Sequence, residues 1–501
     1  MAAGQASMSI RKIPIFYLWA FLGTAAAYLF RLVLARSLAP ETYGAFYAVI
    51  GFLSFLLIFN DFGLGPAFFF YFAKWRNSPR KARSVFTFVM LAYLFTAFLL
   101  GAMLFFFHDW LALNYFHNPS LSRPLLYFSS LFVFTGISVL VTNYYGITGR
   151  LGRYASFTNV RTILMLLLSI LVMLFAPAEQ LLTLYFGAWL ASFALTLILY
   201  ALGVPFLELL TARVDRDVAA SVWRYATFMF LSAAGGVLLT NLDVLFITYF
   251  RPPIEVGFYA IAIPLAGLFL VLTEPLSIFL QPVIIHHHHR RSTARLRSVL
   301  SSIYNAGVFF LLPFTLLLAV FSREAIIVMF GPEYAAASVA LSILSVCFFF
   351  RALQSLNFAF LYGTGRLRAQ MHIIWVGVVV NTVLNALLIP RYGFVAAAWN
   401  TLAAFLLMFI VSFVVLWRAF RIALPVRKWL ATAALSIVLL AVVAWLKGSL
   451  ALPLYPKALV IGFIFIAAYI GIGIFALRIV RWQQLRQLAS ALLSALGSKE
   501  K

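Results

Sequence analysis

Long apolar stretches separated by short polar connections run along the whole chain. Fourteen of them are long enough to cross a membrane as helices, since a bilayer core takes about 20 apolar residues. Barrel strands are only about 10 residues long and alternate in polarity, so a β-barrel is not favoured. The pattern predicts an all-α polytopic membrane protein with spans at residues 14–35, 44–72, 84–107, 124–148, 158–176, 182–205, 224–250, 257–285, 299–321, 336–362, 371–389, 396–417, 429–446 and 457–478.

Composition excludes several other classes of protein. Of the 501 residues, 64% are hydrophobic and 10% are charged, and the mean hydropathy is +1.03. Ordinary soluble domains are about 45–50% apolar and about 25% charged. A soluble enzyme, a disordered chain and a disulfide-rich secreted domain are therefore excluded, the last also because Cys347 is the single cysteine.

The net charge of +24 would suggest a nucleic-acid-binding protein if the basic residues were clustered on one domain. They lie instead at the ends of the apolar spans, and most of them fall on every second connection. Basic connections mark the cytoplasmic side of a membrane protein. We therefore expect a multi-pass protein of the cell membrane with both termini in the cytoplasm, and no nucleic-acid partner.

Two sequence landmarks recur in the same order. Ala39-Pro-Glu-Thr-Tyr-Gly44 has a counterpart in Pro252-Pro-Ile-Glu-Val-Gly257, at an offset of 213 residues. Tyr145-Gly-Ile-Thr-Gly-Arg-Leu151 has a counterpart in Tyr362-Gly-Thr-Gly-Arg-Leu367, at an offset of 216 residues on the second glycine. Each landmark takes the same place in a set of six spans, so the halves insert with the same orientation. The repeat predicts two six-helix lobes related by a parallel pseudo-twofold axis along the membrane normal.

The spans and the repeat together predict the domain organisation. We expect an N-lobe at 1–205, a cytoplasmic interfacial linker at 206–223, a C-lobe at 224–417, two accessory helices within 418–478 and a cytoplasmic tail at 479–501.

Five charged residues are expected inside the membrane: Arg31, Asp61, Asp243, Glu274 and Arg351. Charges in a bilayer are costly, and they usually face a bundle interior or a wet cavity, often as pairs. At the repeat offset Asp61 matches Glu274, and Arg31 falls within one residue of Asp243. The first two spans of each lobe are therefore predicted to line one central cavity. A purely structural alternative pairs Arg31 with Asp243 for packing, and for Asp61 we favour a local role as the cap of its own turn.

Other polar residues are expected to have no catalytic or metal-binding role. Arg161 and His372 lie near the predicted inner membrane edge, where extension of the side chain to the interface accounts for them. Four adjacent histidines, His286–His289, cannot all face one ion on a helix, so we expect no metal site. The sequence contains no phosphate-binding lysine loop, no zinc-protease motif and no nucleophile elbow. We expect neither an enzyme nor a bound cofactor.

Several segments resemble the polysaccharide-biosynthesis flippases of the multidrug/oligosaccharidyl-lipid/polysaccharide (MOP) exporter superfamily. They are Leu32–Gly44 through Asp61-Phe-Gly-Leu64, the Tyr-Gly-x-Thr-Gly-Arg-Leu pattern, and Phe330-Gly-Pro-Glu-Tyr-Ala335. The resemblance is to the Wzx type more than to the lipid II flippases, and multidrug exporters of the superfamily usually have twelve spans. It implies two lobes around a cavity that opens alternately to each side, and a lipid-linked oligosaccharide as cargo, with cavity arginines meeting its phosphate.

We therefore expect a flippase that moves a polyprenyl-(pyro)phosphate-linked oligosaccharide from the inner to the outer leaflet for cell-surface glycan assembly. Its expected partners are membrane lipids, the lipid-linked glycan, and the glycosyltransferases or polymerase of the same pathway. A polytopic glycan polymerase or ligase, a drug or small-molecule exporter, and an archaeal relative serving N-glycosylation remain open alternatives.

On this reading the charged residues divide into three roles. Arg31 and Arg351 would bind the phosphate, because a guanidinium stays charged and offers several donors. Asp243 and Asp61 would supply counter-charge in the cavity. Glu274 would couple transport to a proton or sodium gradient, because burial raises the pKa of a carboxylate.

Overall fold

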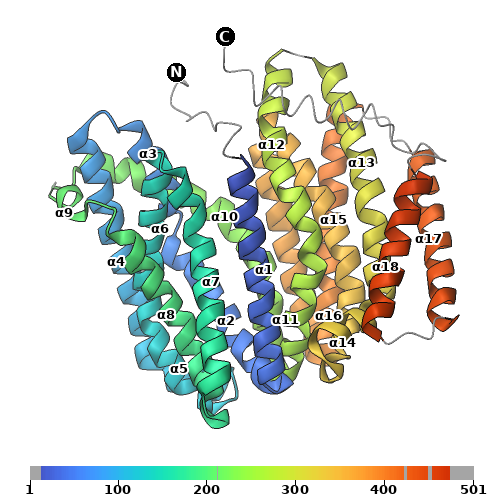
Figure 1. Ribbon diagram of the computed structural model, residues 1–501. Coiled ribbons are helices and arrows are strands. Elements are labelled where there is room, and N and C mark those ends of the chain that lie inside the picture. Colours follow the sequence, from blue (N-terminus) through green and yellow to red (C-terminus); the bar gives the residue numbers. More distant parts are fainter. Residues whose placement is uncertain (1–12, 212, 291, 422–425, 450–453, 474–501) are drawn as a thin grey trace. The chain divides into compact units, whose positions relative to one another are not determined.

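The computed structural model describes residues 13–211, 213–290, 292–421, 426–449 and 454–473, and its regular elements in these ranges are all helices (Figure 1). The predicted cytoplasmic tail at 479–501 and the first twelve residues lie outside them. The chain divides into two compact units, Met1–Gly257 (unit 1) and Phe258–Lys501 (unit 2).

Unit 1 is built from long apolar helices and a few short connecting ones. They are α1 (Ile13–Ser37), α2 (Pro40–Asp61), α3 (Leu64–Lys74), α4 (Pro79–Trp110), α5 (Ser122–Tyr127), α6 (Leu131–Ile147), α7 (Leu151–Phe175), α8 (Leu181–Ala201), α9 (Phe206–Leu209) and α10 (Arg216–Phe250). A core of buried aromatic and aliphatic side chains joins α3, α4, α6 and the start of α10. The helices of this unit therefore form one packed bundle.

Unit 2 continues from α11, within which the division falls. Its helices are α11 (Pro253–Ala266), α12 (Leu270–His289), α13 (Thr293–Val320), α14 (Ser322–Phe330), α15 (Ala337–Gly363), α16 (Leu367–Phe420), α17 (Val426–Ser449) and α18 (Leu454–Gly471). A smaller apolar cluster around Phe309 and Tyr469 holds α17 and α18 against α13. The two C-terminal helices are thus packed on unit 2.

The predicted spans agree with these helices as far as the structure describes them, and residues 474–478 of the last predicted span lie outside the described ranges. Within the described ranges, ten helical segments are long and apolar enough to cross a membrane by themselves. Three predicted spans are each divided between two or more helices, α2 with α3, α5 with α6, and α11 with α12. Conversely, α16 contains two predicted spans, 371–389 and 396–417, which meet at Gly393, where the backbone is not helical (φ 62°, ψ −147°). The all-α polytopic prediction is confirmed.

The break between α2 and α3 has a local cause. Phe62 (φ 41°) and Gly63 (φ 73°) both adopt left-handed backbone conformations, which end α2. A side chain on Gly63 would lie 2.1 Å from the carbonyl oxygen of Ala226 in α10, so glycine is needed there for close packing as well as for its φ. The turn places Asp61 at the end of α2, facing the start of α3.

The second sequence landmark has the same backbone geometry in both units. Gly149 (φ 77°) and Gly365 (φ 74°) are both left-handed. The amide of the following arginine donates to the carbonyl five residues earlier in each case, Arg150 to Tyr145 at 3.0 Å and Arg366 to Leu361 at 2.8 Å. This repeated helix ending supports the predicted internal repeat.

The first landmark brings its two copies together inside unit 1. A Cβ on Gly44 would lie 1.8 Å from the carbonyl oxygen of Pro253, and a Cβ on Gly257 would lie 2.8 Å from the carbonyl oxygen of Pro40. Pro40 and Pro253 are themselves related by the 213-residue offset, so the contact is reciprocal. Reciprocal contacts of this kind arise around a twofold axis.

The division into compact units falls within α11, and the predicted lobe boundary at residue 205 stays a prediction. Over the predicted interfacial linker, 206–223, the structure has the short α9 and the start of α10, which begins at Arg216. Asp215 starts α10 early because its side chain accepts from the amides of Asp217 (3.0 Å) and Val218 (3.4 Å). The helix then packs on α2 and α3, which places it within unit 1.

Candidate functional site

Arg31 lies on α1 and is half-buried against tyrosines of unit 1. The guanidinium carbon is 5.3 Å from the centre of the Tyr47 ring, in cation–π contact. The phenols of Tyr28 and Tyr43 lie within electrostatic reach of the same group. Aromatic hydroxyls and ring faces therefore surround this cation.

Asp243 lies on α10 and is 2% exposed. Its neighbour Val244 packs at Gly51 of α2, where a Cβ would lie 2.6 Å from the valine side chain. Since Tyr47 is one helical turn before Gly51, Asp243 and Arg31 approach adjacent turns of α2. Their direct pairing stays a prediction.

Arg351 occupies the middle of α15 in unit 2 and is half-buried. Its guanidinium carbon lies 5.2 Å from the ring centre of Phe348 and 5.3 Å from that of Phe405 on α16. Neither a hydrogen bond nor an ion pair links Arg351 to any other residue that the structure describes. Two aromatic rings contact the Arg351 guanidinium, and its N–H groups donate no hydrogen bond to a described residue.

Glu274, on α12, lies within electrostatic reach of Arg351. Ser277 and Ser355, one turn further along the two helices, are hydrogen-bonded at 3.2 Å, which fixes this alignment of α12 with α15. The carboxylate of Glu274 is nevertheless exposed. This face of α12 is not covered within the described part of unit 2, and the coupling role expected for Glu274 stays a prediction.

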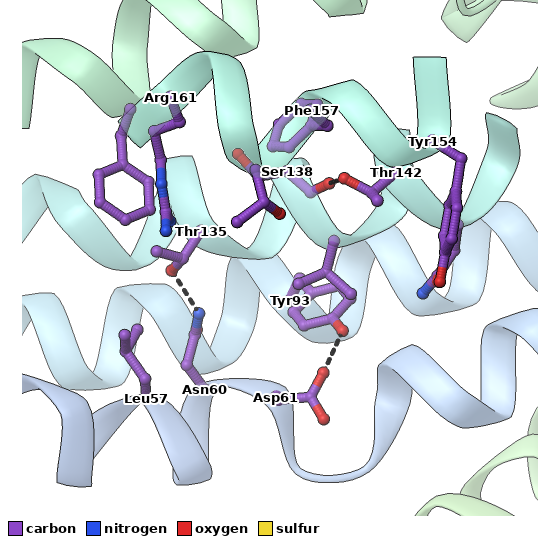
Figure 2. A pocket seen from close by; sticks show the side chains of 14 residues that line it. Leu57, Asn60, Asp61, Tyr93, Thr135, Ser138, Thr142, Tyr154, Phe157 and Arg161 are labelled. Atoms are coloured by element: carbon purple, nitrogen blue, oxygen red, sulfur yellow. Dashed lines mark hydrogen bonds between the residues drawn. The ribbon is translucent and has the colours of Figure 1, made fainter. Parts of the chain in front are cut away.

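A cavity of about 390 Å³ lies inside unit 1 between α2, α4, α6, α7 and α8 (Figure 2). Its lining combines aromatic rings with hydroxyl, amide and ionic groups: Leu57, Asn60, Asp61, Tyr93, Thr135, Ser138, Val139, Thr142, Asn143, Tyr154, Phe157, Thr158, Arg161 and Phe193. Ligand pockets are commonly about 300–1,000 Å³ with a few converging polar groups. The cavity has the size and chemistry of a small-molecule site.

Asp61 forms part of the cavity wall and also caps α3. Its Oδ1 accepts hydrogen bonds from the Tyr93 hydroxyl at 2.6 Å and from the Gly65 amide at 3.1 Å. The expected capping role is therefore present, and the residue still borders the cavity, as the dashed contact with Tyr93 in Figure 2 shows. The side-chain amide of the neighbouring Asn60 donates a hydrogen bond to the Thr135 hydroxyl at 2.9 Å.

Arg161 also lines this cavity, ten residues after α7 begins at Leu151. Its expected place near the inner membrane edge stays a prediction. Its guanidinium lies 4.3 Å from the centre of the Phe193 ring and extends toward Thr135 (Figure 2).

A signal for this cavity was present in the sequence as two polar stripes at helical spacing. Thr135, Ser138 and Thr142 recur along α6 at intervals of three and four residues, and Tyr154 and Arg161 are seven residues apart on α7. Such stripes inside apolar spans mark one polar helix face. The side-by-side packing of α6 and α7 joins the two faces.

The histidines that could bind a metal ion lie outside this cavity. No group of three or more metal-ligating side chains is found in the part of the chain that the structure describes. His286–His289 lie at the end of α12, and His372 is exposed on α16. The structure thus brings no metal ligands together there.

Two archaeal membrane proteins are similar to this chain in sequence. An uncharacterized membrane protein of Methanocaldococcus jannaschii is 25% identical over 496 residues, covering 94% of this chain and 96% of that protein. The probable low-salt glycan biosynthesis flippase Agl15 of Haloferax volcanii is 27% identical over 195 residues, covering only 37% of this chain and 40% of that protein.

Two solved structures share the fold. The lipid II flippase MurJ, in an inward closed conformation, has a TM-score of 0.77 at 12% identity, covering 93% of this chain and 99% of that one. An inward-facing multidrug resistance transporter of the MATE family has a TM-score of 0.64 at 14% identity, covering 79% and 94%. The model of the polysaccharide biosynthesis protein family matches residues 33–339, the larger part of the chain. The chain therefore belongs to the polysaccharide biosynthesis protein family, as its sequence motifs predicted.

Proposed function

We propose that this protein is a flippase that moves a polyprenyl-(pyro)phosphate-linked oligosaccharide from the inner to the outer leaflet of the cell membrane by alternating access. The family and the MOP fold support a transporter of this general type. Most basic residues fall on every second connection between the spans, on one side of the membrane, which supports cytoplasmic termini. Cell-surface glycan assembly would then supply the cargo and its glycosyltransferase partners.

One observation favours an anionic cargo above the alternatives. Arg351 lies in the middle of an apolar span, held by Phe348 and Phe405, and within the described residues it has no acceptor. Intramembrane charges are costly and mark transport pathways. A guanidinium whose donors are free matches a phosphate, which accepts several of them at once.

Transport by purified protein in liposomes tests this proposal. The wild-type protein should move a labelled polyprenyl-pyrophosphate-linked oligosaccharide to the other leaflet without changing its mass. Arg351→Ala should reduce the rate at least about tenfold, since a charge-assisted hydrogen bond is worth about 1.5–3 kcal/mol. Arg351→Lys should restore it only in part, because an ammonium lacks the planar fork of donors.

The matched control is Arg368→Ala, which removes an exposed arginine at the start of α16. It should transport at the wild-type rate. A new glycosidic product would support a polymerase or ligase, and efflux of drugs without glycan transfer would support a small-molecule exporter. Either result would refute the flippase proposal.

A further inference from the structure

The cavity inside unit 1 contains a cation without a counter-ion. Arg161 makes cation–π contact with Phe193, a ring that is itself 5% exposed. Within the described ranges its guanidinium has neither a hydrogen-bond acceptor nor a carboxylate partner. A cation in a membrane-embedded cavity loses much of its hydration, so unused donors favour an anionic ligand.

A second unpartnered group points to a ligand in the same place. Ser138 is 7% exposed and lines the cavity, and its hydroxyl has no hydrogen-bond partner among the described residues. Buried hydroxyls are almost always hydrogen-bonded, so an orphaned one calls for an explanation. In Figure 2 the Ser138 side chain lies between those of Arg161 and Tyr93.

The far side of the cavity offers an acceptor. Both hydrogen bonds of Asp61 go to its Oδ1, and its Oδ2 has no partner in the described structure. A ligand therefore meets a cation at one end and a free carboxylate oxygen at the other. An anion alone would be repelled by Asp61, and an organic cation would be repelled by Arg161.

These groups fit a sugar that bears a carboxylate. Its carboxylate would take the donors of Arg161, its hydroxyls would donate to Asp61 and bond with Ser138, and its ring would lie among Tyr93 and Phe157. The volume of about 390 Å³ is at the lower end for ligand pockets, which suits one or two sugar rings. We propose that this cavity is a binding subsite for an acidic sugar unit, such as a hexuronate, of the transported glycan.

This inference rests on the proposed function and makes it more specific. Arg161 and Arg351 lie in different compact units, so the sugar anion and the lipid-linked phosphate are assigned to separate groups. A flippase with this subsite would discriminate between acidic and neutral glycans that carry the same lipid.

Binding by the full-length protein in detergent tests the subsite directly. Glucuronate, glucose and inorganic phosphate are titrated at constant ionic strength, with thermal stabilisation as the readout. Glucuronate should bind at least about tenfold more tightly than glucose, and Arg161→Gln should abolish that difference. Ser138→Ala should weaken glucuronate binding severalfold.

The control is Arg153→Gln, which removes the same charge from the same helix outside the cavity, where Arg153 donates to the Tyr145 hydroxyl at 3.3 Å. It should bind glucuronate as the wild type does. Equal binding of phosphate and glucuronate would show that the cavity recognises charge alone and would overturn the sugar assignment. Unchanged glucuronate binding by Arg161→Gln would overturn the site.

Transport then separates this inference from the proposed function. In liposomes, Arg161→Gln should slow transport of a lipid-linked glycan that contains a hexuronate at least about tenfold, and leave transport of a neutral glycan on the same lipid unchanged. Equal transport of both glycans by this variant would refute the subsite while the flippase proposal stands. Failure of the wild-type protein to move either glycan would refute the flippase proposal, whatever glucuronate binding shows.

Discussion

The close contact between the two copies of the first sequence landmark makes a sharp stability prediction for Gly44→Ala. A Cβ at this position of α2 would lie 1.8 Å from the carbonyl oxygen of Pro253 and 2.6 Å from its carbonyl carbon. Both are backbone atoms and cannot rotate away. Ordinary contacts begin at 3.4 Å, so the two helix starts must separate by about 1.6 Å.

The expected cost follows from two opposing effects. Overpacking of this kind usually costs about 1–3 kcal/mol, and more where the obstacle is backbone. Alanine regains about 1 kcal/mol of helix propensity over glycine, so we expect a net destabilisation of about 1–2 kcal/mol or more. Gly257→Ala should cost less, because its nearest obstacle, the Pro40 carbonyl oxygen, is 2.8 Å away.

The control is Gly236→Ala on α10, which is exposed and has no atom within 4 Å of the added Cβ. It keeps the propensity gain without the overlap and should melt at or above the wild-type temperature. The assay is thermal unfolding of the purified proteins in detergent, followed by circular dichroism. A Gly44→Ala protein that melts together with Gly236→Ala would refute the reciprocal helix contact.

Three further predictions concern charged groups. Arg31→Ala should slow transport of the lipid-linked glycan; full rescue by the additional change Asp243→Ala would show that the pair is only structural, whereas a phosphate-binding role predicts no rescue. Glu274→Gln should retain binding of the cargo but lose any dependence of its transport on an imposed proton or sodium gradient; an unchanged response to both gradients would contradict the coupling role. Burial, and then repulsion by His286 and nearby arginines, lowers the pKa of His287 below its usual value. The unfolded chain therefore binds more protons at this site below about pH 6.5, so stability should fall as the pH decreases from about 7 to 5.5, and His287→Gln should make that fall shallower in thermal unfolding.

Sequence periodicity was sufficient for the spans because length and polarity dominate helix formation in a membrane. The backbone details at their ends depend on single residues. Asp215 begins α10 at Arg216, before the predicted span at 224, and Gly393 interrupts α16 without ending it. The unit boundary depends on tertiary contacts of α10, which a repeat offset does not contain.

The charged residues show where sequence reasoning reached its limit. The 213-residue offset places Arg31 within one residue of Asp243, and in the structure both residues lie near neighbouring turns of α2. Exposure is a different matter, since it depends on which face of a helix is covered. Glu274 is exposed although it lies in an apolar span, and the contact of Arg161 with the Phe193 ring depends on how α7 packs against α8.

The support of intramembrane arginines by rings has a consequence for transport. Arg351 lies against Phe348 and Phe405, and Arg161 lies against Phe193. A cation–π contact is worth about 0.5–2 kcal/mol, whereas breaking a buried ion pair costs about 3–5 kcal/mol. A ring orients the guanidinium and leaves its donors available, so an arriving anion need not displace a carboxylate. An arginine held in this way can bind and release an anion at low cost, which suits a carrier that must reset after each cycle.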